Sequence, residues 1–306
     1  MLRTHQPWFA STAVIVVLAG GLATAQNHLQ QALQSAVDHA MAGQSGSAVV
    51  LEVGSRSVLA QHGLDVAARR LAAPGSAIKP FTLFALLDSG HFDPQERFYC
   101  RRRLQIAAQT MDCTHPEVPA GFDASEALAY SCNSYFASFA SHLTGENLRE
   151  EFQRAGLLSP TGITAQEAVG GMRNPESREQ LQLLALGEEG IAVTPLGLLN
   201  AYRGLALRQT TSSSDAAWAV VSQGLKGSTE YGMAHAAQPE GLAVAGKTGT
   251  ARSAASPLTH GWFAGYAPAD HPEIVLVVYL EHARGMDAAA LARKIFTAYQ
   301  QARGVR

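Results

Sequence analysis

Apolar and polar residues are patterned differently along this chain, and the pattern predicts strands at both ends with helices between them. At the front, residues 30–41 carry apolar positions at helical spacing, and β-branched residues make 47–53 and 57–61 strand-like. Toward the end, the expected elements are strands 243–251, 262–266 and 273–280 and a helix over 286–302. Because short connections join successive strands, we expect antiparallel pairing in one sheet.

The middle of the chain, from about residue 81 to 224, is predicted to be mostly helical with long loops. Its expected helices are 124–143, 148–155, 176–186 and 194–207. The predicted fold class is therefore α+β: an antiparallel five-stranded sheet covered by helices, plus an inserted all-helical lobe. A cleft between the sheet and the lobe is the expected place for a functional site.

An apolar run precedes these elements, from Trp8 to about Ala23. Small residues in Ala23-Thr24-Ala25 occupy the two positions that signal peptidase recognises, which predicts a secretory signal cleaved before Gln26. The run is also nearly long enough to remain as an anchor in the inner membrane. In either case we expect residues 26–306 to form an exported domain, in the periplasm or another extracytoplasmic space.

Composition and charge limit the partners and cofactors that the chain is expected to bind. A formal charge of −2 over 306 residues, with no long basic block, argues against nucleic acid as a partner. Three cysteines follow the leader, and in an exported protein the proximity of Cys100 and Cys113 predicts a disulfide that leaves Cys132 free. The sequence has no Cys-x-x-Cys, His-Glu-x-x-His or carboxylate cluster at metal spacing, so we expect neither a metal nor a cofactor.

The first candidate for chemistry is Ser76, in a stretch that begins with Pro74-Gly75 and leads into an apolar helix. Lys79 is three residues further on, so the two side chains would share a helix face with Cβ atoms about 5–6 Å apart. A hydroxyl beside an amine is a nucleophile beside a potential base. The N–H groups of a helix start would also suit a developing oxyanion. Alone, however, Ser-x-x-Lys occurs by chance in most long chains.

Two further short motifs are candidates. In Ser131-Cys132-Asn133 the serine and asparagine cannot share a helix face, so a loop or a helix end must present them together. Lys247-Thr248-Gly249-Thr250 lies on a predicted strand, where period two puts the two threonines on one side and Lys247 on the other. Gly249 leaves room for a ligand or a neighbouring backbone to approach closely. Each motif is weak when taken singly.

Taken together, Ser-x-x-Lys, Ser-x-Asn and Lys-Thr-Gly-Thr in this order resemble the motif set of the penicillin-binding proteins. These are the active-site-serine D,D-transpeptidases and D,D-carboxypeptidases of bacterial cell-wall synthesis. The likeness extends to the segments 73–81, 190–196, 245–251 and 262–268, and it covers about residue 43 to the C-terminus. It implies a β-lactamase/transpeptidase-like fold and acyl transfer on D-Ala-D-Ala stem peptides of peptidoglycan, with penicillin as an alternative acylating agent.

The resemblance implies catalytic roles for four residues. Ser76 would be the acylated nucleophile, and Lys79 in its neutral form would take the proton of Ser76. Ser131 would relay a proton to the leaving amine, and Lys247 would orient Ser131 and add positive potential. A free lysine has a pKa near ~10.4, so burial and nearby positive charge would have to lower the pKa of Lys79.

The resemblance also implies substrate-binding positions. Asn133 would hold the substrate amide, while Thr248 and Thr250, with Gly249 between them, would bind the terminal carboxylate of D-Ala-D-Ala or of a β-lactam. Backbone N–H groups of Ser76 and Thr250 would form the oxyanion hole. The expected partners are thus peptidoglycan stem peptides and β-lactams.

Two other functions stay open from the sequence. A serine β-lactamase shares the fold, but the water-activating Glu-x-x-Leu-Asn of one class is missing between Asn133 and Lys247. An exported sensor of cell-wall peptides or β-lactams would bind without turnover. The segment Gly187-Glu188-Glu189-Gly190 carries acids where the family more often has a glutamine between glycines, either as a surface change or in contact with the cleft. The choice between transpeptidation and carboxypeptidation also remains open.

Overall fold

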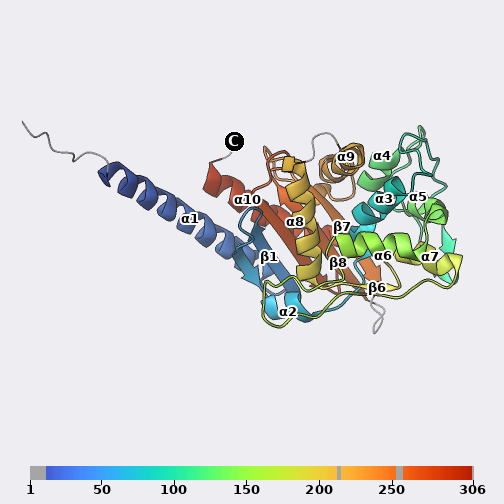
Figure 1. The fold of residues 1–306 in the computed structure, drawn as a ribbon, viewed down its shortest axis with the longest axis horizontal. Coiled ribbons are helices and arrows are strands. Elements are labelled where there is room, and N and C mark those ends of the chain that lie inside the picture. The colour runs from blue at the N-terminus through green and yellow to red at the C-terminus, as the bar shows by residue number, and fades with distance from the viewer. Residues whose placement is uncertain (1–11, 212–214, 253–257, 305–306) are drawn as a thin grey trace, which may run out of the picture.

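The computed structural model describes residues 12–211, 215–252 and 258–304, with side chains from residue 26 onward (Figure 1). The α-helices are α1 (Thr12–Met41), α2 (Leu64–Arg69), α3 (Lys79–Asp88), α4 (Ala124–Ala129), α5 (Asn133–Phe139), α6 (Gly145–Arg154), α7 (Arg178–Leu186), α8 (Pro195–Thr211), α9 (Ala216–Glu230) and α10 (Gly285–Arg303). The strands are β1 (Gly46–Glu52), β2 (Val58–His62), β3 (Gln105–Ile106), β4 (Gln109–Thr110), β5 (Gly171–Met172), β6 (Ile191–Ala192), β7 (Ala245–Arg252), β8 (Thr259–Ala267) and β9 (Ile274–Glu281). Short 3₁₀ helices are η1 (Gly75–Ile78), η2 (Ala140–His142) and η3 (His235–Ala237).

The main sheet has five strands in the order β2-β1-β9-β8-β7, and every neighbouring pair is antiparallel. Helices α1 and α10 cover one face, and α8 with the helical lobe covers the other (Figure 1). Successive residues of β9 alternate between the two cores: Val277 faces the α8 side and Val278 the α10 side. This sandwich of one sheet between helices confirms the predicted α+β class.

The helical lobe is organised around α3, which packs against α4, α5, α6, α7 and α9. The lobe is not all-helical as expected, because β3–β4 and β5–β6 form two small two-stranded sheets within it. Strands of two residues are too short to produce a period-two pattern in the sequence. The predicted helix over 124–143 is also interrupted, since Ser131 has a φ of 57° that no right-handed helix accommodates.

Helix α1 runs without a break through the expected cleavage position before Gln26, and residues 1–11 of the predicted leader lie outside the described part of the chain. Its C-terminal half packs through Leu33 and Val37 into the core beside α10. Its N-terminal half extends away from the body (Figure 1). No helix among the described residues is long and apolar enough to cross a membrane.

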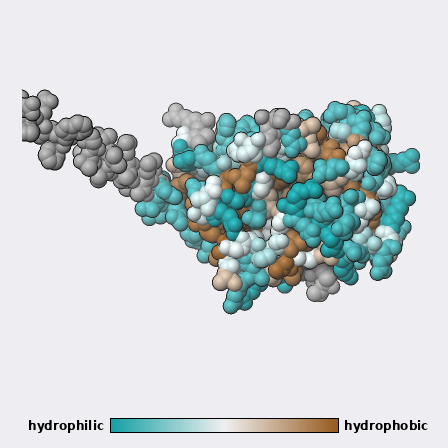
Figure 2. All heavy atoms as spheres, in the orientation of Figure 1, coloured by the Kyte–Doolittle hydropathy of each residue, from teal (hydrophilic) through white to brown (hydrophobic). Residues whose placement is uncertain are grey.

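The surface is of mixed character on the face seen in Figure 2. Hydrophilic side chains predominate over the helical lobe, and hydrophobic residues form small patches separated by polar ones (Figure 2). Such scattered apolar residues are normal for a folded domain. The surface pattern on this face does not mark a functional site. The three sequence motifs meet elsewhere, between β7 and the lobe.

Candidate active site

Ser76 and Lys79 stand at the junction between the sheet and the lobe. Ser76 lies in η1, which leads directly into α3, and Lys79 is the first residue of α3. Ser76 is partly exposed, whereas Lys79 is completely buried. The apolar side chains of α3 hold this helix in the lobe core, so the structure presents an accessible hydroxyl three residues before a buried amine.

Lys79 connects this first motif to the second one. Its Nζ donates hydrogen bonds to the Ser131 backbone oxygen at 2.8 Å, to Ser131 Oγ at 3.3 Å and to Asn133 Oδ1 at 2.6 Å. Burial lowers the pKa of Lys79 to about 8, against the raising influence of nearby Cys113, Cys132 and Glu188. A buried lysine with this pKa has a substantial neutral fraction near neutral pH and can accept a proton.

The second motif is presented by a break between two helices, as its spacing required. Ser131 adopts the left-handed region with a φ of 57°, and Cys132 is the N-cap residue of α5. Asn133 is then the first residue of α5, and its Nδ2 donates to the Met111 backbone oxygen at 3.0 Å. The serine and asparagine side chains therefore both reach the Lys79 amine, which a continuous helix would not allow.

The third motif lies on β7, the edge strand that faces the lobe. Lys247 is fully buried, and its Nζ donates to the Thr248 backbone oxygen at 3.3 Å. Burial, reinforced by the charge of Lys79, lowers its pKa well below the usual value. Thr250 Oγ1 accepts a hydrogen bond from the Gly285 N–H at 2.8 Å, and Thr248 also adjoins Gly285. The predicted two-sided arrangement is confirmed, with the threonines on the α10 side and Lys247 toward Lys79.

Close backbone packing brings β7 against η1. A Cβ added at Gly249 would lie 2.2 Å from the Pro74 backbone oxygen, and one at Gly75, whose φ is 52°, would lie 2.5 Å from the Thr250 backbone oxygen. Trp262 on β8 adds a hydrogen bond from Nε1 to the Ala73 backbone oxygen at 3.0 Å. These contacts place Ser76 beside the third motif without any side chain between the two backbones.

We expect Gly249→Ala to destabilise the fold, because the new methyl group has no room against Pro74. Overpacking of this kind typically costs about 1–3 kcal/mol. Urea denaturation should show a lower free energy of unfolding. Gly204→Ala on α8 is the matched control, because its added Cβ would meet nothing within 4 Å. Equal stability of the two variants would contradict the close approach.

Glu188 is a carboxylate of the site whose place the sequence left undecided. It is partly buried and accepts a hydrogen bond from the Arg252 backbone N–H at the end of β7. Burial raises its pKa to about 7, while Lys79 and Arg252 act in the opposite direction. The neighbouring Gly187 backbone oxygen accepts a 2.9 Å hydrogen bond from the Gly75 N–H. Glu188 therefore lies beside the first motif, whereas Glu189 is exposed.

The predicted Cys100–Cys113 disulfide is wrong, because all three cysteines are free thiols. Cys113 instead has its Sγ 3.9 Å from that of Cys132, which lies inside the second motif. With Cys100 and His115 they form a group whose ligand atoms all lie within 4.8 Å of one another. Within the described part of the chain this is the group that could hold a metal ion, and the sequence analysis expected none.

Six of the eight residues proposed from the sequence thus lie between β7, η1 and the start of α5: Ser76, Lys79, Ser131, Asn133, Lys247 and Gly249. The side chains of Thr248 and Thr250 lie on the α10 side of β7, where Thr248 Oγ1 donates to the Met233 backbone oxygen at 3.4 Å. A partly exposed hydroxyl, a buried amine of lowered pKa, a serine–asparagine pair and a threonine-lined edge strand are suited to covalent acyl transfer. The arrangement brings together a hydroxyl, an amine of lowered pKa and hydrogen-bonding side chains.

The comparisons with known proteins concern the same part of the chain. The family described as the penicillin binding protein transpeptidase domain matches residues 46–299. The peptidoglycan D,D-transpeptidase MrdA of Acinetobacter baumannii is 25% identical over 224 residues, covering 56% of this chain and 33% of that protein. The peptidoglycan D,D-transpeptidase PbpA of Mycobacterium tuberculosis is 24% identical over 248 residues, covering 68% and 50%. The chain therefore spans between a third and a half of these relatives.

Solved structures are similar in fold. The D,D-transpeptidase domain of a peptidoglycan glycosyltransferase from Eggerthella lenta has a TM-score of 0.76 and 21% identity, covering 90% of this chain and 82% of that one. Pseudomonas aeruginosa PBP2, solved in complex with WCK 5153, has a TM-score of 0.74 and 22% identity, covering 89% and 76%.

Proposed function

This chain belongs to the family of penicillin-binding protein transpeptidase domains, and on that premise we propose that it is a serine D,D-transpeptidase or D,D-carboxypeptidase. Its substrate would be the D-Ala-D-Ala end of a peptidoglycan stem peptide, and penicillin would acylate the same serine. The observation that carries the proposal is the triple hydrogen bonding of Lys79 to Ser131 and Asn133. These hydrogen bonds join Lys79 of the first motif to the second motif, at the place where β7, which carries the third motif, packs against η1.

In the acylation step, Ser76 Oγ attacks the carbonyl carbon of the penultimate D-Ala. Neutral Lys79 takes the hydroxyl proton, and Ser131, hydrogen-bonded to the same amine, delivers a proton to the leaving D-Ala nitrogen. The C–N bond breaks, and an ester to Ser76 remains. Lys247 is buried close by, and the charge of Lys79 helps burial to lower the pKa of Lys247.

Substrate binding uses groups that retain hydrogen-bonding capacity. Thr250 Oγ1 already accepts from Gly285, so its own proton is free for a substrate carboxylate. Asn133 would hold the substrate amide. The Thr250 N–H lies close to the Gly75 backbone, which supports an oxyanion hole formed with the Ser76 N–H. Losing one such donor typically raises the barrier by about 3–4 kcal/mol.

The test is incubation of the protein with a stem pentapeptide, with and without an amine acceptor, followed by mass measurement of the products. We expect the terminal D-Ala to be released. If the acyl group is transferred to the amine rather than to water, a cross-linked product should also appear. Stable penicillin acylation without any peptide product would favour a sensor. Rapid release of hydrolysed penicillin would favour a β-lactamase.

We also propose that the domain acts outside the cytoplasm, because residues 8–25 read as a leader. N-terminal sequencing of protein from its native host should begin at Gln26 if the leader is cleaved. An intact N-terminus in the membrane fraction would indicate an anchor instead. Full-length protein in the cytosolic fraction would contradict export.

A further inference from the structure

We propose that Cys100, Cys113, His115 and Cys132 bind one Zn²⁺ ion beside the second motif. Their four ligand atoms all lie within 4.8 Å of one another, although three separate segments of the chain contribute them. Three thiolates and one imidazole are a ligand set typical of structural zinc sites. Nothing in this inference depends on the proposed peptidase activity.

His115 is held in the orientation of a metal ligand. It is only 1% exposed, and its Nδ1 donates a hydrogen bond to the Pro116 backbone oxygen at 2.7 Å. This bond fixes the tautomer in which Nε2 carries a lone pair, and Nε2 is buried with no hydrogen-bond partner. An unpaired buried nitrogen is unfavourable unless something binds it. A carbonyl behind Nδ1 is the usual support for a histidine that binds metal through its other nitrogen.

Each of the three sulfur atoms lies at a backbone N–H group. Each accepts one backbone N–H: Cys100 from Arg102 at 3.2 Å, Cys113 from Ser134 at 3.4 Å and Cys132 from Tyr135 at 3.4 Å. Hydrogen bonds from N–H groups favour a thiolate over a thiol.

The spacing of the sulfur atoms fits zinc better than a disulfide. Two sulfurs bound about 2.3 Å from zinc at the tetrahedral angle lie roughly 3.8 Å apart. The Cys113 and Cys132 sulfurs are 3.9 Å apart. A disulfide would need about 2.05 Å between them, so the pair has metal-ligand spacing as it stands.

The position of the group indicates what the ion would do. Cys132 lies between Ser131 and Asn133, and it caps the helix that presents them. A zinc ion would therefore fasten the loop of residues 100–115 to the second motif. With four protein ligands the ion has no open position for substrate or water, so its role is structural.

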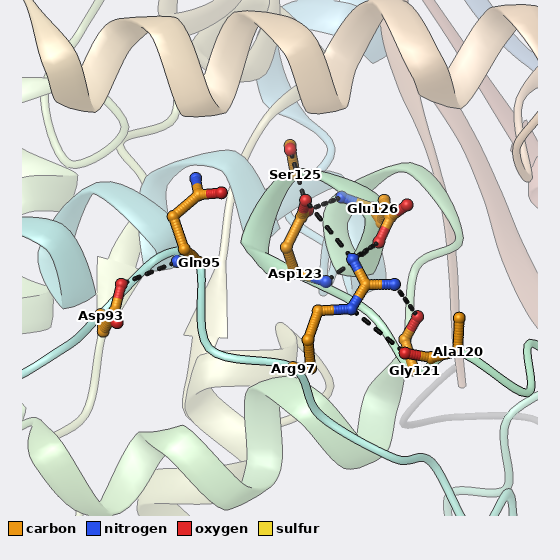
Figure 3. Close-up of polar contacts among 8 residues, drawn as sticks. All are labelled: Asp93, Gln95, Arg97, Ala120, Gly121, Asp123, Ser125 and Glu126. Carbon is orange, nitrogen blue, oxygen red and sulfur yellow. Dashed lines mark hydrogen bonds and ion pairs between the residues drawn. The ribbon is translucent and has the colours of Figure 1, made fainter.

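Arg97, which precedes this loop in the chain, is hydrogen-bonded to residues that follow the loop (Figure 3). Its guanidinium donates to the backbone oxygens of Ala120 and Gly121 and to Glu126 Oε2 at 2.7 Å, and it lies 3.8 Å from Asp123. Asp123 and Glu126 also cap α4, the helix that ends just before Ser131. The ion would add a second attachment, which would join this loop to Cys132 in the second motif.

The experiment measures metal content in the full-length protein, purified without added metal or chelator. Inductively coupled plasma mass spectrometry should find about one zinc per chain. His115→Ala should lose most of the zinc, whereas His115→Cys, which keeps four ligands, should retain it. His142→Ala is the matched control, because His142 also bonds a backbone oxygen through Nδ1 but lies on the surface. Ser76→Ala, which removes the proposed nucleophile and none of the four ligands, should keep its zinc. The test of zinc binding is therefore independent of the test of catalysis.

Two further readouts decide the outcome if His115→Ala does not fold. Wild-type protein loaded with Co²⁺ should show thiolate-to-metal charge transfer and the intense visible bands of a tetrahedral site. After chelation in denaturant, thiol counting should find three free cysteines per chain, matching the three in the sequence. Metal-free protein with a disulfide between any two cysteines would overturn the proposal, as would full zinc content in both His115→Ala and Cys100→Ser.

Discussion

Ser76→Ala should abolish the covalent penicillin adduct that the wild-type chain is expected to form. Ser76 is the partly exposed hydroxyl of η1, and the Thr250 backbone lies against the neighbouring Gly75. Alanine removes the attacking oxygen and leaves the backbone unchanged. Intact-protein mass spectrometry should show a one-penicillin increment in the wild type and in Ser141→Ala, a surface-serine control, and no increment in Ser76→Ala.

The wild-type adduct should also persist for many minutes. Once the lactam ring has opened, its amine remains tethered and blocks the acceptor position. Glu188, the carboxylate near Lys79, accepts a hydrogen bond from the Arg252 N–H, and the water-activating Glu-x-x-Leu-Asn of one β-lactamase class is missing from the sequence. An adduct that disappears within seconds, with hydrolysed drug accumulating, would identify a β-lactamase. An adduct that survives in Ser76→Ala would point to another nucleophile, such as the thiol of Cys100, and would refute the site.

The sequence predicted the fold well where patterns are long and regular. The strands β1, β2, β7, β8 and β9 all match predicted strands within a few residues. Runs of β-branched residues indicate β1 and β9 most clearly. Strand pairs β3–β4 and β5–β6 were not expected, since each strand has two residues and its conformation depends on tertiary contacts. Nothing in the local sequence indicates that Ser131 adopts the left-handed conformation, yet this conformation interrupts the helix predicted over residues 124–143.

The proposed site residues were found by order and spacing, whereas the cysteine cluster was not. The sequence contains no closely spaced ligand pair such as Cys-x-x-Cys, and the short separation of Cys100 and Cys113 favours a disulfide between them. In the fold, Cys132, which follows α4 in the chain, joins Cys100 and Cys113, and His115 adds a nitrogen. Only the packing of the lobe brings these segments together. Glu188 and Glu189, in contrast, are recognisable from the sequence as unusual, because they stand where the family more often has a glutamine between glycines.

Lys79→Ala should slow acylation by roughly 10²–10⁴-fold, the usual contribution of a general base. Its Nζ has hydrogen bonds to Ser131 and Asn133, so its loss would remove both the proposed base and the contact between the first two motifs. Lys294→Ala, an exposed lysine of α10, is the control and should acylate at the wild-type rate. Stopped-flow measurement with a fluorescent penicillin gives both rates. An unchanged rate in Lys79→Ala would exclude Lys79 as the base.

The pH dependence gives the second half of this test. Burial lowers the pKa of Lys79 from 10.5 to about 8, so the neutral amine predominates above pH 8 and the acylation rate should rise through that region to a plateau. Three neighbouring groups raise the pKa of this amine against the effect of burial: Cys113, Cys132 and Glu188. Glu188→Gln removes one raising influence, so the midpoint of the rise should move to lower pH. A midpoint that moves upward, or a rate independent of pH between 6 and 10, would show that another group accepts the proton.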